Sequence, residues 1–303
     1  MDYTPSNKIV RIGVFYDGNC FHHISSYYAY HHKLKKRICI NGLHGLIKGL
    51  VSYYEANLDV SRCKIAEAHY FKGRYNAYEA SRHNILFKER VFEEVLQREN
   101  ITPHYRPLSE DRTEKGIDVW LALEAYERTM IKKFDVVVLI ATDSDFVPLI
   151  FKLDSLGVKT LLIGCNFEYY KHDAIKKQTL TCPQLLKIVD YPFLLNELVD
   201  GNYPSRNTDK KKFFNDLMGE LFITRQEEEL KPLEPKLFGK ISNLQDTYGF
   251  IECKQFSTNL FFHKKGLKNI EFEKLMVGDT VEFILGENYD GICAISVEKL
   301  EYI

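Results

Sequence analysis

Residues 135–141 form a nearly unbroken apolar run, DVVVLIA, which constrains the fold more than any other segment. A run of this length, rich in β-branched residues, predicts a strand that is covered on both faces of its sheet. Further apolar runs occupy residues 9–16 and 158–163, with helical patterns between them. Strands that alternate with helices predict an α/β fold with a parallel sheet and right-handed crossovers.

The other elements of this half follow from the spacing of apolar residues. Strands are predicted over 64–71 and 101–105, and helices over 43–56, 81–99, 118–132 and 146–156. Residues 191–231 look helical and increasingly charged, and Pro232 and Pro235 interrupt them. We therefore expect an α/β domain over 8–190 and a helical linker over 191–235.

The last part of the chain changes in character. Five short strand patterns, separated by turns, predict a small five-stranded β-barrel domain over 236–303. These patterns cover residues 236–244, 248–254, 259–263, 279–285 and 291–300.

Composition indicates a soluble globular chain, with 45% hydrophobic and 27% charged residues. Neither a secretory signal nor an apolar run of ~18 residues is found, so we expect no membrane partner. The seven cysteines include no C-x-x-C pair, which argues against a disulfide framework or a structural zinc site. Reduced thiols favour a cytoplasmic location, and a homo-oligomer stays open.

Acidic residues follow the predicted strands where these end. Asp17 ends the first strand, and Asp143 and Asp145 directly follow the strand over 135–141. Asp118 opens the helix before that strand. Ligands bind outside the carboxyl ends of parallel strands, so these carboxylates can converge on one site.

Clustered carboxylates repel each other unless a cation or a proton joins them. Their hard oxygen ligands suit Mg²⁺ or Mn²⁺, which can polarise a phosphodiester and hold a water. A plainer role stays open for each residue: Asp17 as a turn residue, and Asp143 or Asp145 as a helix cap. Glu124 lies roughly 120° from Asp118 around a helix, so both cannot readily bind one ion.

Three segments, FYDGNCF, EKGIDVWLALEAY and LIATDSDFVPLI, resemble the signature segments of the NYN family, which is related to PIN nucleases. The resemblance covers roughly residues 8–190 and implies a PIN-like α/β fold with Mg²⁺- or Mn²⁺-dependent RNA cleavage. It implies that the family's acidic positions are Asp17, Asp118, Asp143 and Asp145. Asn19 matches the asparagine that often follows the first Asp, and Glu124 stands where many members have Asp.

Residues 21–100 hold 13 Lys and Arg against 8 Asp and Glu, although the net charge of the chain is −1. A local positive surface could attract phosphates, and ordinary solvated helix faces are the alternative. Lys115 precedes Asp118 and could meet a phosphate as a point charge. Weaker candidates are Arg74, Arg82 and Arg112, and the histidines His22, His23, His31 and His32, all of which have a plain surface role as the alternative.

The barrel strands carry alternating aromatic residues. Tyr248 and Phe250 share one face of their strand, and Phe261 and His263 share a face of the next. Together they could form a platform on which bases stack, at ~1–3 kcal/mol per base. The alternative is an ordinary β core that needs aromatics.

The same strands, with YGFI and LFFH, resemble the ribonucleoprotein motifs of a cold-shock domain, an OB-type barrel, over residues 236–302. The resemblance implies single-stranded RNA as the partner. Because residues 236–303 carry net charge −2, we expect stacking to contribute more than phosphate contacts.

Three functions remain as hypotheses. The first is a metal-dependent endoribonuclease whose barrel holds single-stranded RNA. The second is a non-catalytic RNA-binding regulator with a vestigial acidic site. The third is a scaffold whose acidic barrel binds a protein partner.

Overall fold

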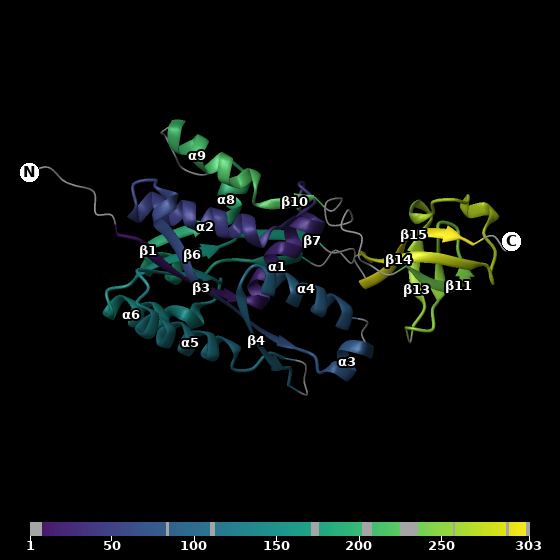
Figure 1. The fold of residues 1–303 in the computed structure, drawn as a ribbon, viewed down its shortest axis with the longest axis horizontal. Coiled ribbons are helices and arrows are strands. Elements are labelled where there is room, and N and C mark those ends of the chain that lie inside the picture. The colour runs from purple at the N-terminus through teal and green to yellow at the C-terminus, as the bar shows by residue number, and fades with distance from the viewer. Residues whose placement is uncertain are drawn as a thin grey trace, which may run out of the picture. The chain divides into compact units, whose positions relative to one another are not determined.

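Six parallel strands form the central sheet, in the order β4-β3-β1-β5-β6-β9 (Figure 1). They are β1 (Val10–Asp17), β3 (Cys63–Arg74), β4 (Ile101–Pro107), β5 (Val136–Ile140), β6 (Lys159–Gly164) and β9 (Tyr191–Leu194). The computed structural model describes residues 8–82, 85–109, 113–170, 176–201, 208–224, 236–256, 258–288 and 291–300. The chain divides into two compact units, the first with Met1–Arg74 and Glu93–Glu228, the second with Tyr75–Phe92 and Glu229–Ile303.

Helices cover both faces of this sheet, as the continuous apolar strands require. Neighbouring residues of β1 show the two layers: Phe15 packs in the cluster that includes α5 and α6, whereas the ring of Tyr16 contacts His44 of α2. The helices of these layers are α2 (Ile40–Glu55), α5 (Ile117–Lys132) and α6 (Val147–Ser155). The predicted α/β class with a parallel sheet is confirmed.

The chain between β1 and α2 is folded locally. It forms α1 (Gly18–Ser26), the π-helix η1 (Tyr27–His31) and the short strand β2 (Lys36–Ile38). After α2 come the 3₁₀ turn η2 (Val60–Arg62), then α3 (Ala77–Arg82) and α4 (Leu86–Arg98). The helix predicted over 81–99 corresponds to α4, but α4 begins later, at Leu86, and Ser81 lies in α3 instead.

The segment after β6 departs most from the prediction. A hairpin of β7 (Phe167–Tyr170) and β8 (Lys176–Thr179) was not predicted, and α7 (Pro183–Ile188) follows it. The helix expected from residue 191 is wrong at its start, since β9 pairs with β6 and completes the sheet. Pro192 fits this strand because an edge strand has one side without partners.

The rest of the predicted linker region also packs on the first unit. It contains α8 (Leu195–Val199), α9 (Thr208–Gly219) and β10 (Phe222–Thr224), and β10 pairs with β2. Helix α9 approaches α2 so closely that a Cβ on Gly49 would lie 2.2 Å from a methyl of Leu217. Residues 225–235, with Pro232 and Pro235, lie outside the described residues. The boundaries 8–190, 191–235 and 236–303 stay a prediction.

The second unit contains the predicted five-stranded barrel, closed in the order β11-β12-β13-β15-β14. Its strands are β11 (Leu237–Leu244), β12 (Tyr248–Glu252), β13 (Leu260–His263), β14 (Thr280–Asn288) and β15 (Gly291–Lys299). The 3₁₀ turns η4 (Lys264–Gly266) and η5 (Phe272–Lys274) lie between β13 and β14. Inward-facing residues such as Ile251, Phe262 and Phe283 form its core.

All seven cysteines are free thiols. Among the described residues, no helix combines the length and the apolar character that crossing a bilayer demands.

Candidate active site and nucleic-acid surface

The strand order places the carboxyl ends of β1 and β5 at the topological switch point of the sheet. From β1 the chain continues to β3 and β4 on one side, and from β5 it continues to β6 and β9 on the other. Tyr16 of β1 lies opposite Ile140 of β5, so Asp17 and Asp143 leave the sheet at adjacent positions. Open α/β sheets bind ligands at this point.

Asp17 is fixed by the helix that it starts. Its Oδ1 atom accepts hydrogen bonds from the backbone amides of Asn19 (3.0 Å) and Cys20 (3.1 Å), as an N-cap of α1. A Cβ on Gly18 would lie 2.5 Å from the carbonyl oxygen of Phe71, so only glycine fits directly after Asp17. Both capping bonds end on Oδ1, so the cap uses one of the two carboxylate oxygens.

Asp143 has a similar local role after β5. It caps the 3₁₀ turn η3 (Ser144–Phe146) by accepting bonds from the Asp145 amide (3.1 Å) and the Ser144 hydroxyl (3.2 Å). The plain capping roles considered from the sequence are thus present. Both Asp143 and Asp145 are exposed.

Asp118 joins these residues electrostatically from the first turn of α5. Its pKa is raised by burial and then by the charges of Asp143 and Asp145. Burial, together with the charge of Asp118, raises the pKa of Asp17 to about 6. Asp118 therefore interacts with each of the other three predicted aspartates at one edge of the sheet, which we call the acidic edge (Asp17, Asp118, Asp143 and Asp145).

Glu114 is a further carboxylate at the acidic edge that was not predicted. Its Oε1 atom accepts a hydrogen bond from the Gly73 amide at the end of β3, at 3.0 Å. Burial raises the pKa of Glu114, and the charge of Asp118 contributes. Its position just before Lys115 and Asp118, in a polar segment of the sequence, was the signal that could have found it.

The other candidate residues predicted for the nuclease domain differ in their exposure and contacts. Asn19 and Lys115 are exposed, and His22 and His23 are exposed on α1. Surrounding atoms that partly exclude solvent from the His23 ring lower its pKa, and the charges of Lys72 and Lys177 add to this effect. Lys72 and Lys177 are thus cations near α1 that were not predicted as candidates.

Three remaining candidates have structural contacts. His32 is buried and lies 3.2 Å from Asp200, and the ring of His31 stacks on Tyr169. The guanidinium of Arg74 lies 4.2 Å above the centre of the Tyr105 ring. The side chain of Arg82 and the whole of Arg112 lie outside the described residues.

Glu124 lies apart from the acidic edge. Its carboxylate accepts a 2.7 Å bond from Arg128 one turn along α5. It groups instead with His69 and His104, with ligand atoms all within 4.8 Å of one another. Within the described ranges, this is the one set of three or more metal-ligating side chains gathered so closely.

On the barrel, the four predicted aromatic and histidine side chains lie on one surface. Tyr248 pairs with His263 and Phe250 pairs with Phe261 across β12 and β13, and all four are half-buried. Ring centres are 5.4 Å apart for Tyr248 and Phe261, and 6.1 Å apart for Phe250 and Phe261. Their strand neighbours Ile251, Leu260 and Phe262 face the core. We call this surface the aromatic platform.

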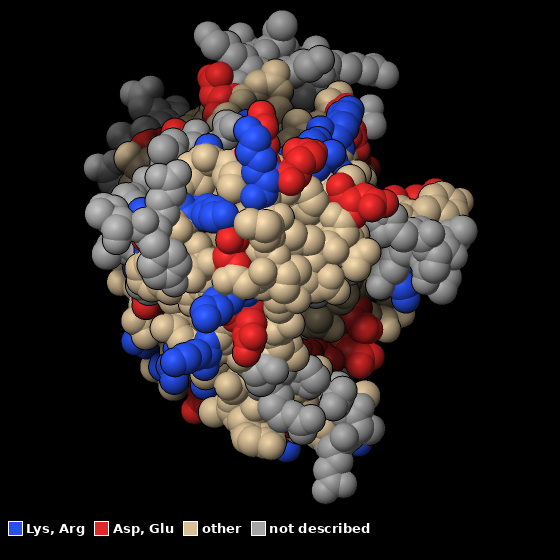
Figure 2. Space-filling model, turned by 90° about the vertical axis from the view of Figure 1, so that its right-hand side faces the viewer, with Lys and Arg blue, Asp and Glu red and all other residues tan. Residues whose placement is uncertain are grey.

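Basic and acidic side chains are interspersed on the molecular surface that Figure 2 shows. On the face drawn in Figure 2, blue and red side chains stand beside one another around a patch of other residues. Among the coloured residues of that view, no broad field of one sign occurs. This distribution agrees with a chain whose net charge is −1.

Comparison with solved structures gives distant similarities. A protein of unknown function from Vibrio parahaemolyticus is 15% identical, covers 64% of this chain and 96% of its own, and has a TM-score of 0.40. The CSD456 segment of Drosophila Unr is 16% identical, covers 45% of this chain and 54% of its own, and has a TM-score of 0.21. A comparison with curated proteins gives no match.

Family models give a more specific answer. The model of the 'Cold-shock' DNA-binding domain matches residues 238–300, which form the barrel that carries the aromatic platform. The NYN domain model matches residues 11–185, which is more than half of the chain and includes the whole acidic edge. The chain therefore belongs to the NYN domain family, with a cold-shock domain following the NYN domain.

Proposed function

We propose that this chain is a metal-dependent endoribonuclease, with the nuclease site at the acidic edge of a domain over 8–190. The observation that carries the proposal is the position of Asp17, Asp118 and Asp143 at the switch point of the sheet, where the charge of Asp118 raises the pKa of Asp17 and the charge of Asp143 raises the pKa of Asp118, which makes ionisation costly there. A divalent cation removes that cost, and hard carboxylate oxygens are the donors that Mg²⁺ and Mn²⁺ prefer.

The donor chemistry suits such a cation, which would draw together carboxylates that, among the described residues, do not gather three ligand atoms within 4.8 Å of one another. Asp17, Asp118, Asp143 and Asp145 would hold it, and Glu114 adds negative charge beside Asp17 and Asp118. When bound, the ion supplies a water of lowered pKa and polarises the phosphodiester. Capping fixes Asp17 and Asp143 in place before any ligand binds, which lowers the cost of organising the site.

Single-stranded RNA is the proposed substrate, held by the cold-shock domain over 236–303. Bases would stack on Tyr248, Phe250 and Phe261, whose rings lie on the barrel surface. Stacking on these rings would contribute the affinity that a positively charged groove contributes in other proteins that bind single strands. His263, paired with Tyr248, would contribute at the same surface. Tethering the platform to the acidic edge raises the effective concentration of RNA there without new contacts.

The test is cleavage of a fluorescent single-stranded RNA by the full chain with Mg²⁺, Mn²⁺ or EDTA. Asp143→Asn and Asp118→Asn should lose cleavage by about 100-fold or more, with unchanged folding and RNA affinity. Asp59→Asn is the matched control, because Asp59 also caps a 3₁₀ turn, η2, and accepts bonds from the amide and hydroxyl of Ser61. It should cleave like the wild type.

The alternative outcomes separate the other functions. RNA binding without cleavage under any metal would favour a non-catalytic RNA-binding regulator. Its motivating observation is Glu124, which is engaged by Arg128 instead of lying at the acidic edge. Absence of RNA binding would favour the scaffold.

A further inference from the structure

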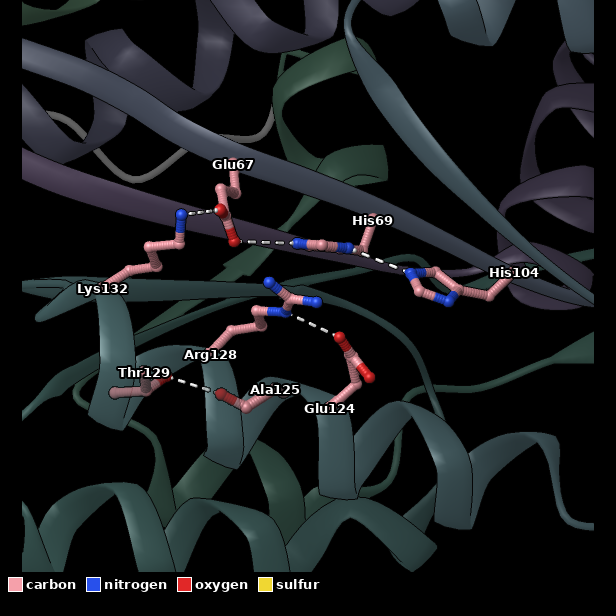
Figure 3. A network of polar contacts seen from close by, with 8 residues as sticks. All are labelled: Glu67, His69, His104, Glu124, Ala125, Arg128, Thr129 and Lys132. Carbon is pink, nitrogen blue, oxygen red and sulfur yellow. Dashed lines mark hydrogen bonds and ion pairs between the residues drawn. The ribbon is translucent and has the colours of Figure 1, made fainter.

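A polar network lies between the sheet and α5, separate from the acidic edge (Figure 3). His69 belongs to β3, His104 to the neighbouring strand β4, and Glu124 to α5. The Nδ1 atom of His69 and the Nε2 atom of His104 are 3.0 Å apart, and a carboxylate oxygen of Glu124 lies within 4.8 Å of both. His69 is buried, and the other two are half-buried.

We propose that His69, His104 and Glu124 bind a transition-metal ion of the Zn²⁺ type. Two imidazoles and one carboxylate are a donor set for borderline metals, and they suit Mg²⁺ poorly. Tetrahedral Zn²⁺ with bonds of about 2.1 Å places its ligand atoms about 3.4 Å apart. The two ring nitrogens at 3.0 Å need to open by only a few tenths of an ångström to reach that spacing.

The surroundings of His69 orient it as a ligand. Its Nε2 atom lies 3.2 Å from a carboxylate oxygen of Glu67, and Lys132 holds the other oxygen of Glu67 at 2.8 Å. A carboxylate that accepts the Nε2 proton leaves the lone pair on Nδ1, the atom that faces His104. This carboxylate–histidine arrangement is the one that supports histidine ligands in metal sites.

Both imidazole rings are also fixed by packing. His69 stacks on Phe15, with ring centres 5.2 Å apart, and His104 stacks on Phe71 at 4.2 Å. Trp120 of α5 meets His104 edge-on at 5.2 Å. Rings held in this way lose little freedom when an ion binds, so the site is largely formed beforehand.

This site is distinct from the acidic edge. Glu124 is six residues beyond Asp118 on α5, which is about 9 Å along the helix and on another side of it. An ion here would join β3, β4 and α5, the helix that carries Asp118. The sequence argued against a structural zinc site because the cysteines include no C-x-x-C pair, and no cysteine takes part in the site proposed here.

Arg128 is the group that competes with the ion. Its guanidinium donates to Glu124 at 2.7 Å, but its side chain is 37% exposed and can move into solvent. Two substitutions should therefore act in opposite directions. Glu124→Gln removes a ligand and weakens Zn²⁺ binding, whereas Arg128→Gln removes the competing cation and strengthens it.

The experiment uses the full chain, stripped with a chelator and dialysed against Zn²⁺ alone. Metal content is measured by mass spectrometry and affinity by competition with a chromophoric chelator, with Co²⁺ as a spectroscopic substitute. We expect the wild type to hold about one more equivalent of Zn²⁺ than Glu124→Gln or His104→Gln, with at least about a tenfold loss of affinity in each. Circular dichroism verifies that each variant folds. If His104→Gln does not fold, Glu124→Gln alone tests the proposal.

Matched controls separate this site from other histidines and carboxylates. Glu127→Gln changes an exposed carboxylate of the same helix, and His22→Gln an exposed histidine of α1. Asp143→Asn changes the acidic edge. All three should retain the equivalent that Glu124→Gln loses. Equal Zn²⁺ content in the wild type and Glu124→Gln, or no bound Zn²⁺ in either, would overturn the proposal and leave a metal-free hydrogen-bond network.

Discussion

The side chain of Glu114 accepts a hydrogen bond from the backbone amide of Gly73, with 3.0 Å between Oε1 and nitrogen. This bond ties the loop before α5 to the carboxyl end of β3, although the two residues are 41 positions apart in the chain. It also fixes a fifth negative charge beside Asp17 and Asp118. The acidic edge is therefore more negative than the predicted aspartates alone would make it.

Glu114→Gln tests that additional charge. Glutamine can still accept the bond from Gly73, so the loop should stay in place while one negative charge is lost. We expect the Mg²⁺ concentration for half-maximal RNA cleavage to rise by about tenfold, since a weaker negative field holds the cation less strongly. RNA affinity should not change. Glu94→Gln, on the exposed side of α4, is the control. An unchanged Mg²⁺ requirement would contradict a role for Glu114.

Asp17→Asn should make the metal-free protein more stable. The pKa of Asp17 is raised from 3.8 to about 6, so wild-type stability is lost as pH rises through this window. Asparagine carries no charge and can still cap α1 through its side-chain oxygen. Above pH 7 in EDTA, we expect a gain of at most about 3 kcal/mol in the free energy of unfolding, measured with denaturant.

Asp17→Ala provides the contrast for this measurement. Alanine also removes the charge, but it loses the cap and its two hydrogen bonds, which costs about 0.5–2 kcal/mol. The free energy of unfolding of Asp17→Asn should therefore be larger than that of Asp17→Ala. The reverse order would show that the charge of Asp17 is not a source of strain in the metal-free fold.

His44 should make stability depend on pH. It is buried on α2, and burial lowers its pKa from 6.5 to about 4, with a contribution from the charge of Lys48. The unfolded chain binds the proton more tightly, so stability falls as pH drops from about 6.5 to about 4. Its Nε2 atom has no hydrogen-bond partner among the described residues. The loss in the wild type should reach up to about 3 kcal/mol.

His44→Leu should lack this part of the pH dependence. Its unfolding free energy, compared with the wild type at each pH by denaturant titration, isolates His44 from the other histidines. His22→Leu, an exposed residue of α1, should keep the wild-type profile. Parallel pH profiles for His44→Leu and the wild type would refute the prediction.

The aromatic platform predicts how the barrel binds RNA. Replacing Tyr248 and Phe261 by leucine keeps apolar surface but removes stacking, which contributes ~1–3 kcal/mol per base. We expect the affinity of the full chain for single-stranded RNA to fall by about tenfold or more for each substitution. Tyr170→Leu, at a 66% exposed tyrosine of β7, is the control. Fluorescence anisotropy at several salt concentrations would measure both affinity and salt dependence.

The expected salt dependence is shallow, because residues 236–303 carry more acidic than basic side chains. A steep loss of affinity with salt, together with unchanged binding by the leucine variants, would show that phosphate contacts bind the RNA instead.

Local patterns in the sequence were sufficient for the strands that position both surfaces. The apolar run of β5 and the acidic residues after it predicted a covered strand that ends at the acidic edge. The alternation in β12 and β13 predicted which side chains leave the barrel core. Each of these features depends on the burial of residues that are near one another in the chain. The spacing of apolar residues along the sequence therefore indicates which side chains are buried.

Tertiary structure alone decided the contacts between distant segments. Glu114 meets Gly73, and His69 meets His104, only because the strand register and the start of α5 bring them together. Pairing with β6 likewise makes residues 191–194 a strand, where the local pattern looked helical. A hydrogen bond or a neighbouring strand supplied from elsewhere in the chain leaves no periodic signal at either partner, so the sequence could place the aspartates but not the groups that join them.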